Sequence, residues 1–393
     1  MEATRTDTKK NEMKYEKSEL ELMTTYQLRE ICRREKIMNG VIHPLDKEEL
    51  IQTIMRYMGK RQDFLICDKK KGGEERVEEF LKKTRIVIKP CKELYCQSQI
   101  LAYEGLSIEY YDGYTIPYKK ELAGTNAFLI GSDKTLCAIL NLKEHGGKRE
   151  KLYLTKAAEL ETRETQRKDY RIFCMGRQTS ESLYHLYYGE HTILPEHIEV
   201  YSIPLIDFVV RKPVTLMLPM AIDFGSVNTT AGVYLDSAYF ENVGEQAAVK
   251  NCRENEINYT AFEDGNGESM LLPSVIGVLA VEEEDYKLLF GYDAIRLANA
   301  SYVDEGFCVF YDVKRWIGEY EKEEEIVDRQ GRRRLVKRAE ILRRFFLYII
   351  RKTENRFKCR ISQVHISSPV KQKHYFRRMF REILPEYMTC QVT

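Results

Sequence analysis

Apolar residues recur at helical spacing in two short stretches near the start of the chain. The first, TTYQLREICRREKI, places Leu28 and Ile31 on one side of a predicted helix, and Thr24 or Thr25 is suited to cap its N-terminus. The second, KEELIQTIMRYM, repeats this spacing, and the intervening MNGVIHPLDK contains Asn-Gly and a proline, which favour an extended loop. The pattern predicts a helix–extended loop–helix module over residues 18–60.

A longer, strand-rich stretch follows this module. Runs of β-branched, aromatic and aliphatic residues, bounded by turn residues, predict strands at 85–89, 126–131, 135–142, 151–155, 170–175 and 198–203. Helical spacing predicts short helices at 77–83 and 180–188, and GSDK is typical of a hairpin turn. We expect a mixed, strand-rich α+β region over 76–215, joined to the helical module by a linker over 62–75, where a lysine run meets Gly-Gly.

From residue 216 onward, the predicted strands and helices are those of an α/β region. LMLPMAIDF and TTAGVYL predict two strands that meet at the turn GSVN. The stretch 325–337 predicts a β-hairpin that turns at Gln330-Gly331. The stretch 339–357 predicts a helix whose apolar side we expect in the core, namely Ile341, Leu342, Phe345, Phe346, Ile349 and Ile350.

Composition and charge narrow the range of functions. The 393 residues predict two or three domains, and a net charge of +1 argues against general attraction to nucleic acid or anionic lipid. The ten cysteines are scattered without the spacing of a zinc site, which suits a reducing compartment. Residues 1–17 are charged and aperiodic, so we expect a disordered tail and no signal peptide. No apolar run approaches the ~20 residues that span a bilayer, so we expect a cytoplasmic protein without membrane contact.

The turn in PMAIDFGSVNTTAGVYLD carries the main candidate chemistry. Gly225 allows the backbone to come close to a ligand, and successive amides of such a turn can hold a phosphate. Ser226 adds a hydroxyl donor, and Asp223, at the end of the first strand, is a suitable partner for a hydrated Mg²⁺ ion. The same residues also fit a plain hairpin with an exposed aspartate, and the turn alone does not distinguish the two.

This turn resembles the first phosphate-binding loop of the actin, sugar-kinase and heat-shock-chaperone ATPase superfamily, and is most similar to that of the seventy-kilodalton heat-shock chaperones. The resemblance continues, in the family's order, through LLPSVIGV (271–278), LLFGYDAIRLA (288–298), FYDVKRWIGEY (310–320) and VHISSPVKQKHYFRRMFRE (364–382). It implies a ribonuclease H-like, actin-type ATPase lobe over 216–393, with a mixed five-stranded sheet and helices, that binds ATP and Mg²⁺.

Carried over position by position, the resemblance assigns roles to the residues of the turn. Asp223 corresponds to the aspartate that holds Mg²⁺ through water, and Gly225 to the glycine of the phosphate loop. Val227 stands where the chaperones have a threonine, so its amide is retained and a hydroxyl is lost. The cofactor-binding residues that we expect are Asp223, Gly225, Ser226, Val227 and Asn228.

The resemblance also points to a catalytic lysine and to a second lobe. Lys314, in VKRW, corresponds to the lysine that contacts the terminal phosphate and the attacking water, and phosphoryl transfer depends on such positioned charge. In the family, a second lobe supplies another phosphate loop and closes the site. We find no second loop in this sequence, so we expect a site completed by a second lobe, with little hydrolysis by the open half-site alone.

The helical module suggests an alternative function. Residues 18–60 resemble SAP-like modules that bind DNA or RNA, in which basic residues of the first helix and the loop face phosphates. The corresponding residues are Arg29, Arg33, Arg34 and Lys36. The alternative is therefore a nucleic-acid or protein interaction module on a non-hydrolysing, ATPase-like scaffold. A polymerising actin-like protein is a third hypothesis.

Overall fold

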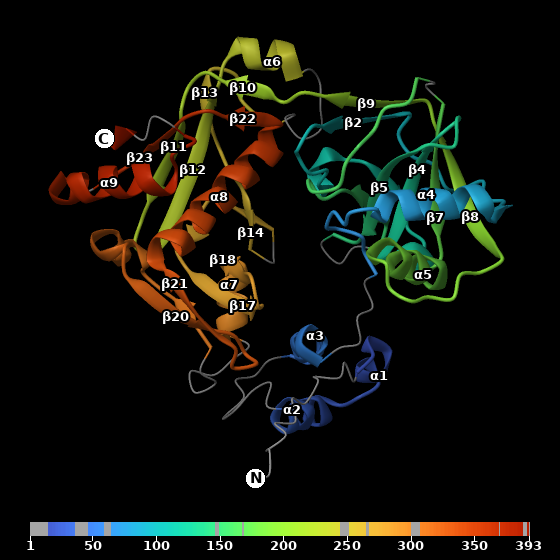
Figure 1. Cartoon of the computed structure of the whole chain (residues 1–393), viewed down its shortest axis with the longest axis horizontal. Helices are drawn as coiled ribbons and strands as arrows, with labels where there is room; N and C mark the ends of the chain where they lie inside the picture. The colour runs from blue at the N-terminus through green and yellow to red at the C-terminus, as the bar shows by residue number, and fades with distance from the viewer. Residues whose placement is uncertain are drawn as a thin grey trace, which may run out of the picture. The chain divides into compact units, whose positions relative to one another are not determined.

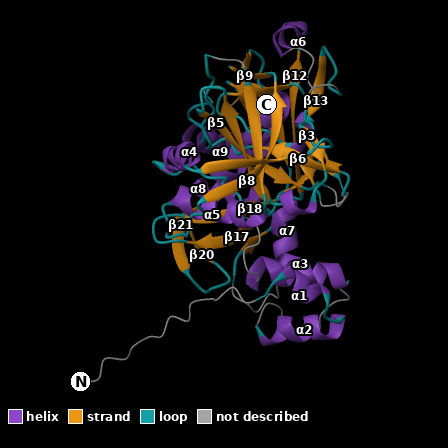
Figure 2. Ribbon diagram, turned by 90° about the vertical axis from the view of Figure 1, so that its right-hand side faces the viewer, coloured by secondary structure: helices purple, strands orange, loops and turns teal. Residues whose placement is uncertain are grey.

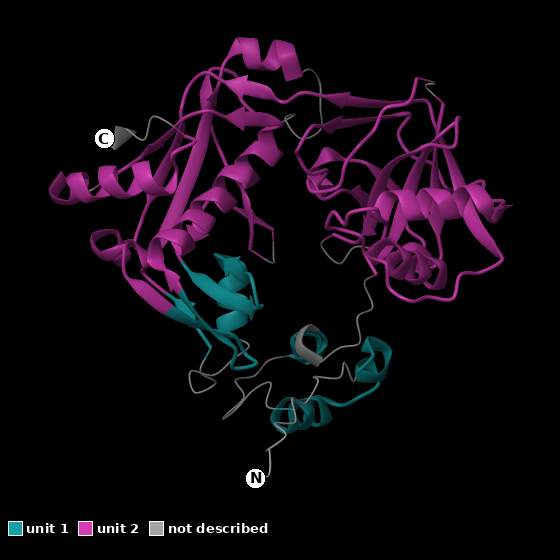
Figure 3. Cartoon of the chain, in the orientation of Figure 1, with its two compact units in different colours: residues 1–62, 275–310, 325–335 teal, residues 63–274, 311–324, 336–393 magenta. Residues whose placement is uncertain are grey.

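Figure 1 shows the computed structural model of the chain. It describes residues 15–35, 46–58, 64–145, 149–166, 169–243, 251–264, 267–299, 307–368, 370–387 and 391–392. Figure 3 colours its two compact units, of which the first comprises residues 1–62, 275–310 and 325–335 and the second comprises residues 63–274, 311–324 and 336–393. Most of the predicted tail, and most of the loop predicted between the first two helices, lie outside the described residues.

Short helices form the N-terminal module of the first unit (Figure 2). They are α1 Lys17–Glu21, α2 Thr25–Arg34 and α3 Lys47–Met58. Helix α2 begins at the predicted cap: the Thr24 hydroxyl accepts from the Gln27 amide, and the Gln27 side chain accepts from the Thr24 amide. The small core that the helices share consists of Leu20, Leu28, Ile31, Cys32, Leu50, Ile51 and Ile54.

The strand-rich region is built on a seven-stranded sheet in the second unit. Its strands are β1 Arg85–Lys89, β3 Thr115–Pro117, β4 Thr125–Gly131, β5 Leu136–Lys143, β6 Lys151–Thr155, β7 Tyr170–Met175 and β8 His197–Leu205. They follow the order β1-β8-β7-β4-β5-β6-β3, in which β1 and β8 are parallel and the other neighbours are antiparallel. All six predicted strands are confirmed, and the turn GSDK closes the β4–β5 hairpin.

Buried side chains cover both faces of this sheet. Alternate residues of β4 point to opposite faces, so Phe128 packs with helices α4 Gly73–Lys83 and α5 Arg177–Tyr188, whereas Leu129 packs in a second core on the other side. As a result β4 is buried at every position. Both predicted helices are confirmed. The region also contains the parallel pair β2 Gln99–Tyr103 and β9 Asp207–Arg211, and the short 3₁₀ helices Tyr110–Asp112 and Lys120–Leu122.

The structure differs from the linker predicted over 62–75. Ile66 is fully buried, and its amide donates to Asn126 Oδ1 at 2.8 Å. The Asn126 side chain in turn donates to the Phe64 carbonyl oxygen, and Asn141 donates to Asn126 Oδ1 at 3.0 Å. Buried amide side chains need such partners, and the backbone of this segment supplies them. Residues 64–75 of this segment therefore belong to the folded region, and helix α4 already begins at Gly73.

A second, mixed sheet forms the centre of the region from residue 216 onward. Its strands are β11 Met220–Phe224, β12 Asn228–Leu235, β13 Glu256–Tyr259, β23 Val364–Ile366 and β24 Gln391–Val392, with β16 Leu272–Pro273 paired to β12. They follow the order β13-β12-β11-β23-β24; β12 is antiparallel to β11 and β13, and β23 is parallel to β11 and β24. The chain is therefore a mixed α/β protein with a curled mixed sheet and several helices (Figure 1).

Helix α8 Arg338–Phe357 packs against this second sheet. The six apolar side chains predicted for its inner side are all fully buried. The ring of Phe346 lies edge-on to that of Phe224 in β11, with centroids 5.0 Å apart. The other described elements of this region are helices α6 Ser237–Val243 and α9 Lys373–Ile383, the 3₁₀ helices Val313–Glu319 and Val370–Gln372, and the short strands β10 Val214–Leu216, β14 Phe262–Glu263, β15 Glu268–Ser269 and β22 Cys359–Ile361.

The remaining described elements lie wholly or partly in the first unit. A sheet of order β18-β17-β19 consists of β17 Ile276–Val281, β18 Tyr286–Phe290 and β19 Val309–Phe310, and helix α7 Tyr292–Asn299 follows β18. The hairpin of β20 Glu323–Val327 and β21 Arg333–Lys337 turns at the predicted place, where the Gly331 amide donates to Asp328 O at 2.9 Å. Among the described residues, no helix has both the length and the apolar character needed to cross a membrane.

Candidate functional site

The turn GSVN forms a hairpin bend between β11 and β12. In the antiparallel register Phe224 pairs with Thr229, so the bend comprises residues 225–228. The Gly225 amide donates to Asn228 O at 3.1 Å, which closes the bend. A Cβ added at Gly225 would lie only 2.2 Å from that oxygen. The glycine is therefore required by the close approach of two backbone segments.

The buried Ser274 forms hydrogen bonds to the carbonyl groups of the bend. The Ser274 hydroxyl donates to Gly225 O at 2.8 Å and lies 2.9 Å from the Thr229 hydroxyl. The Ser274 amide donates to Val227 O, also at 2.8 Å. Because Ser274 and Thr229 have no solvent exposure, water does not compete for these bonds. The carbonyl groups of the bend are thus directed inward, toward Ser274.

The outer side of the bend is accessible. The Ser226 and Val227 side chains are exposed, the latter to 74 %. Neither of their amides donates to another backbone group in the part of the chain that the structure describes. Two neighbouring amides without a backbone acceptor are the feature that anion-binding turns share. The absent hydroxyl at Val227 leaves this amide as the only donor that the residue offers.

A carboxylate stands beside the bend at the same edge of the sheet. Asp223 is the penultimate residue of β11, and Ser367 follows β23, the parallel neighbour of β11. The Ser367 hydroxyl donates to Asp223 Oδ1, and the Ser367 amide donates to Ile222 O at 3.0 Å. Because the carboxyl ends of parallel strands meet at one edge, two segments far apart in sequence orient this single exposed carboxylate.

The donor set at Asp223 fits Mg²⁺ better than a transition metal. No group of three or more His, Cys, Asp or Glu side chains gathers as a metal site among the residues described. Mg²⁺ commonly keeps several waters and takes one or two carboxylates together with the phosphates of a nucleotide. Asp223 and the neighbouring Ser367 hydroxyl, both at an exposed position, suit that mode of binding.

Lys314 lies on a different element. It belongs to the 3₁₀ helix Val313–Glu319, and its ammonium lies 5.9 Å from the centre of the buried Phe376 ring in α9. Neighbouring Arg315 pairs with Asp312, and the Arg338 guanidinium stacks on Trp316. In the described residues, no hydrogen bond or ion pair joins Lys314 to the bend. The structure therefore brings the five predicted residues 223 and 225–228 together, but does not bring Lys314 into contact with them.

Two contributors to this site escaped the sequence analysis. Ser274 lies within the matched segment LLPSVIGV and Ser367 within VHISSP, but nothing in the sequence assigned either of them a role. Each serine directly follows a short strand of the structure, β16 or β23, that the sequence analysis had not predicted. Only the strand pairing reveals that both serines reach β11 and its bend.

The basic residues of the helical module are partly committed to ion pairs. Arg33 lies 2.6 Å from Glu30, and Arg34 contacts Glu35 and the Tyr15 hydroxyl. Lys36 lies outside the described residues. Binding of nucleic acid by this module, which would require these cations to exchange their partners for phosphates, stays a prediction.

Comparison with known proteins adds no family to these observations. A scan against protein-family models and a search of curated proteins find no match to the chain. The functional argument is therefore carried by the geometry of the bend and its neighbours.

Proposed function

We propose that the region from residue 216 onward binds Mg-ATP through the bend between β11 and β12. The observation that carries this proposal is the bend itself, in which Ser274 holds the carbonyl groups inward while the Ser226 and Val227 amides remain available. Phosphate oxygens accept hydrogen bonds from such amides, and the Ser226 hydroxyl supplies a further donor. Gly225 permits the close approach on which this arrangement depends.

Asp223 is proposed to orient the divalent ion that accompanies the nucleotide. Its carboxylate adjoins the bend, so an ion held there through water would neutralise the charge of the same phosphates. The hydrogen bond from Ser367 restricts the rotation of this carboxylate. Asn228, whose carbonyl oxygen closes the bend, maintains the loop rather than contacting the nucleotide directly.

The sheet supports the ATPase interpretation suggested by the resemblance. An antiparallel β13-β12-β11 ribbon continues through two parallel strands, β23 and β24, with α8 before β23 and α9 after it. With β16 paired to β12 the sheet has six strands rather than the five expected, and its mixed order with neighbouring helices supports the proposal of an actin-type lobe. On this proposal, Lys314 contacts the terminal phosphate once nucleotide is bound, and hydrolysis depends on a second lobe that closes over the site.

A chaperone-type ATPase with a protein client is the activity that we propose for the completed site. In such a site the chain's own residues bind and orient the triphosphate, while closure excludes water and strengthens each electrostatic contact. The isolated region is therefore proposed to bind Mg-ATP with little turnover.

Titration calorimetry of the full chain with ATP tests this function. With Mg²⁺ present we expect saturable heat from the wild type and about tenfold or more weaker binding by Asp223→Ala, since a tenfold change is about 1.4 kcal/mol. With EDTA the two proteins should bind ATP equally, because the carboxylate acts through the ion. Asp169→Ala, which removes an exposed carboxylate in the strand-rich region, serves as the control. Equal Mg-ATP affinities for the wild type and Asp223→Ala, or no heat from either, would refute the proposal.

A further inference from the structure

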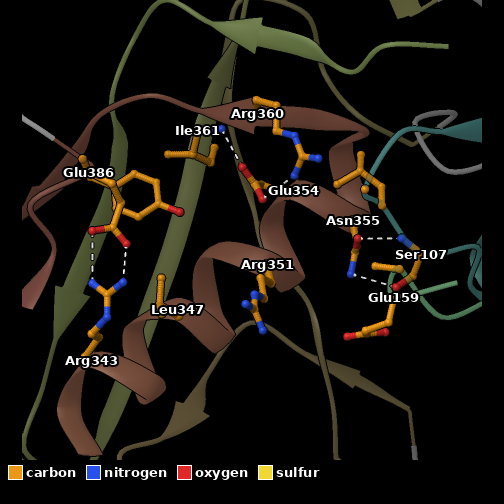
Figure 4. A pocket seen from close by; sticks show the side chains of 14 residues that line it. Ser107, Glu159, Arg343, Leu347, Arg351, Glu354, Asn355, Arg360, Ile361 and Glu386 are labelled. Carbon is orange, nitrogen blue, oxygen red and sulfur yellow. Dashed lines mark hydrogen bonds and ion pairs between the residues drawn. The ribbon is translucent and has the colours of Figure 1, made fainter. Parts of the chain in front are cut away.

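A pocket of about 630 Å³ lies on the outer side of helix α8 (Figure 4), and no residue of the bend lines it. One wall is a stripe along α8 that includes Arg343, Leu347 and Arg351, which recur at intervals of four residues and so share one helix face. The opposite wall comes from the strand-rich region, with Leu106, Ser107 and Glu159. The volume is that of an ordinary small-molecule site.

Fixed contacts hold the two walls together. The Ser107 amide donates to Asn355 Oδ1 at 3.0 Å, and the Arg360 guanidinium donates to Glu104 O at 2.8 Å. Next to these bonds, the Lys358 ammonium lies 2.8 Å from Asp112, and both side chains are almost fully buried. The pocket is therefore preformed, and its walls are not free to collapse on one another.

Most charges that line the pocket are already neutralised within the protein. Arg343 holds both oxygens of Glu386 in a forked pair, at 2.7 and 3.1 Å. Glu354 accepts from Arg360 at 3.2 Å and from the Ile361 amide at 2.9 Å. These hydrogen bonds already occupy the guanidinium and carboxylate groups that form them.

Two opposite charges have no direct hydrogen bond or ion pair within the part of the chain that the structure describes, and they act on Glu354 and Lys156 only at longer range. In Figure 4 no dashed line reaches Arg351 or Glu159, and no hydrogen bond or ion pair is found for either side chain among the described residues. Arg351 projects from the helical wall and Glu159 from the opposite wall. Leu347, Leu106 and Ile361 supply apolar surface in the same pocket. The pocket thus offers one cation, one anion and apolar contacts to the same ligand.

We propose that this pocket binds a short zwitterionic peptide, with Arg351 on the α-carboxylate and Glu159 on the α-ammonium group. A guanidinium presents parallel donors that match a carboxylate, and a carboxylate oxygen accepts from an ammonium group. A ligand with both charges pairs both protein groups at once, whereas an anion or a cation alone leaves one of them unpaired. Apolar side chains of the peptide would cover Leu347 and Leu106.

Titration calorimetry of the full chain with leucyl-leucine as the probe tests this site. We expect saturable binding of the dipeptide, and affinities about ten- to a hundredfold weaker for N-acetyl-leucyl-leucine and leucyl-leucinamide, since each lacks one charge-assisted hydrogen bond. Free leucine and trileucine, tested in parallel, identify the length that spans the two walls.

Matched variants separate recognition from folding. Arg351→Gln should bind the amidated and free dipeptides with equal, weak affinity, and Glu159→Gln should do the same for the acetylated and free forms. Both residues are exposed, so the thermal unfolding of the variants should match that of the wild type. Arg377→Gln, an exposed arginine on α9, should bind as the wild type does. Absence of dipeptide binding, equal binding of the capped peptides by the wild type, or unchanged affinity in both variants would overturn the proposal.

Discussion

Replacement of Lys358 by methionine is expected to lower the free energy of unfolding by about 3–5 kcal/mol, the usual cost of leaving a buried charge unpaired. The Lys358 ammonium lies 2.8 Å from Asp112 Oδ2 and 3.0 Å from Ser107 O, and its side chain is only 3 % exposed. Burial raises the pKa of Asp112, and the Lys358 charge opposes this effect. Urea unfolding of the full chain, followed by tyrosine fluorescence, measures the loss.

The double variant Asp112→Asn/Lys358→Met isolates the unpaired charge. In the wild type the Glu109 amide donates to the Asp112 carboxylate at 2.7 Å, and an asparagine retains an acceptor for this amide. The double variant should therefore regain most of the stability. Lys352→Met, in the last turns of α8, which ends just before Lys358, should change the free energy of unfolding by no more than about 0.5 kcal/mol. If Lys358→Met and Lys352→Met were equally stable, the buried pair would not have the role assigned to it.

The deficit of Lys358→Met should also depend on pH. Without the ammonium, the pKa of Asp112 in the folded state should rise further above the value of about 3.9 expected in the unfolded chain. A carboxyl group with a raised folded-state pKa costs nothing below the unfolded value, and costs more as the pH rises toward the folded value. The variant should therefore approach wild-type stability near pH ~4 and fall furthest below it near neutrality.

Gly225→Ala is expected to abolish detectable Mg-ATP binding while the protein remains folded. The added methyl group would lie 2.2 Å from Asn228 O, so the backbone of the bend must shift and its amides change direction. Amides that hold an anion act only when they are already aimed at it. Calorimetry with Mg-ATP measures the loss, and far-ultraviolet circular dichroism checks the fold.

Two further variants provide an intermediate case and a control for this loss of affinity. Ser274→Ala removes the hydroxyl that donates to Gly225 O but keeps the backbone, so we expect a smaller loss of affinity, about tenfold. Gly176→Ala has no atom within 4 Å of the added Cβ and should bind nucleotide as the wild type does. Normal affinity in Gly225→Ala would show that the bend takes no part in binding.

Local patterns in the sequence predicted much of the fold. The strands β1, β6 and β7 end at the residues expected, because runs of β-branched and aromatic residues are bounded there by turn or charged residues. Helix α8 was equally clear, since its apolar residues recur at helical spacing over several turns. Thr24 was one of the two caps proposed, because capping needs only residues a few positions apart.

Contacts between segments that are distant in sequence could not be predicted from such local patterns. Asn126 forms hydrogen bonds with the backbone of Phe64 and Ile66, so residues 64–75 of the stretch predicted as a linker belong to the folded region. No local sequence pattern predicts such a bond. For the same reason no sequence pattern indicated that Ser274 supports the bend or that Lys358 pairs with Asp112. The sequence predicted only the apolar side of α8, and the role of its outer stripe as the wall of a pocket depends on what lies opposite.

Hydrogen–deuterium exchange with and without Mg-ATP measures most directly whether the bend between β11 and β12 receives the nucleotide. The account predicts that saturating Mg-ATP slows exchange, at the shortest labelling times, in the peptide that spans residues 222–230, because the Ser226 and Val227 amides become donors to phosphate. It predicts no change in that peptide for Gly225→Ala. Unchanged exchange over 222–230 at a nucleotide concentration that produces saturating heat would place the nucleotide elsewhere and contradict the account.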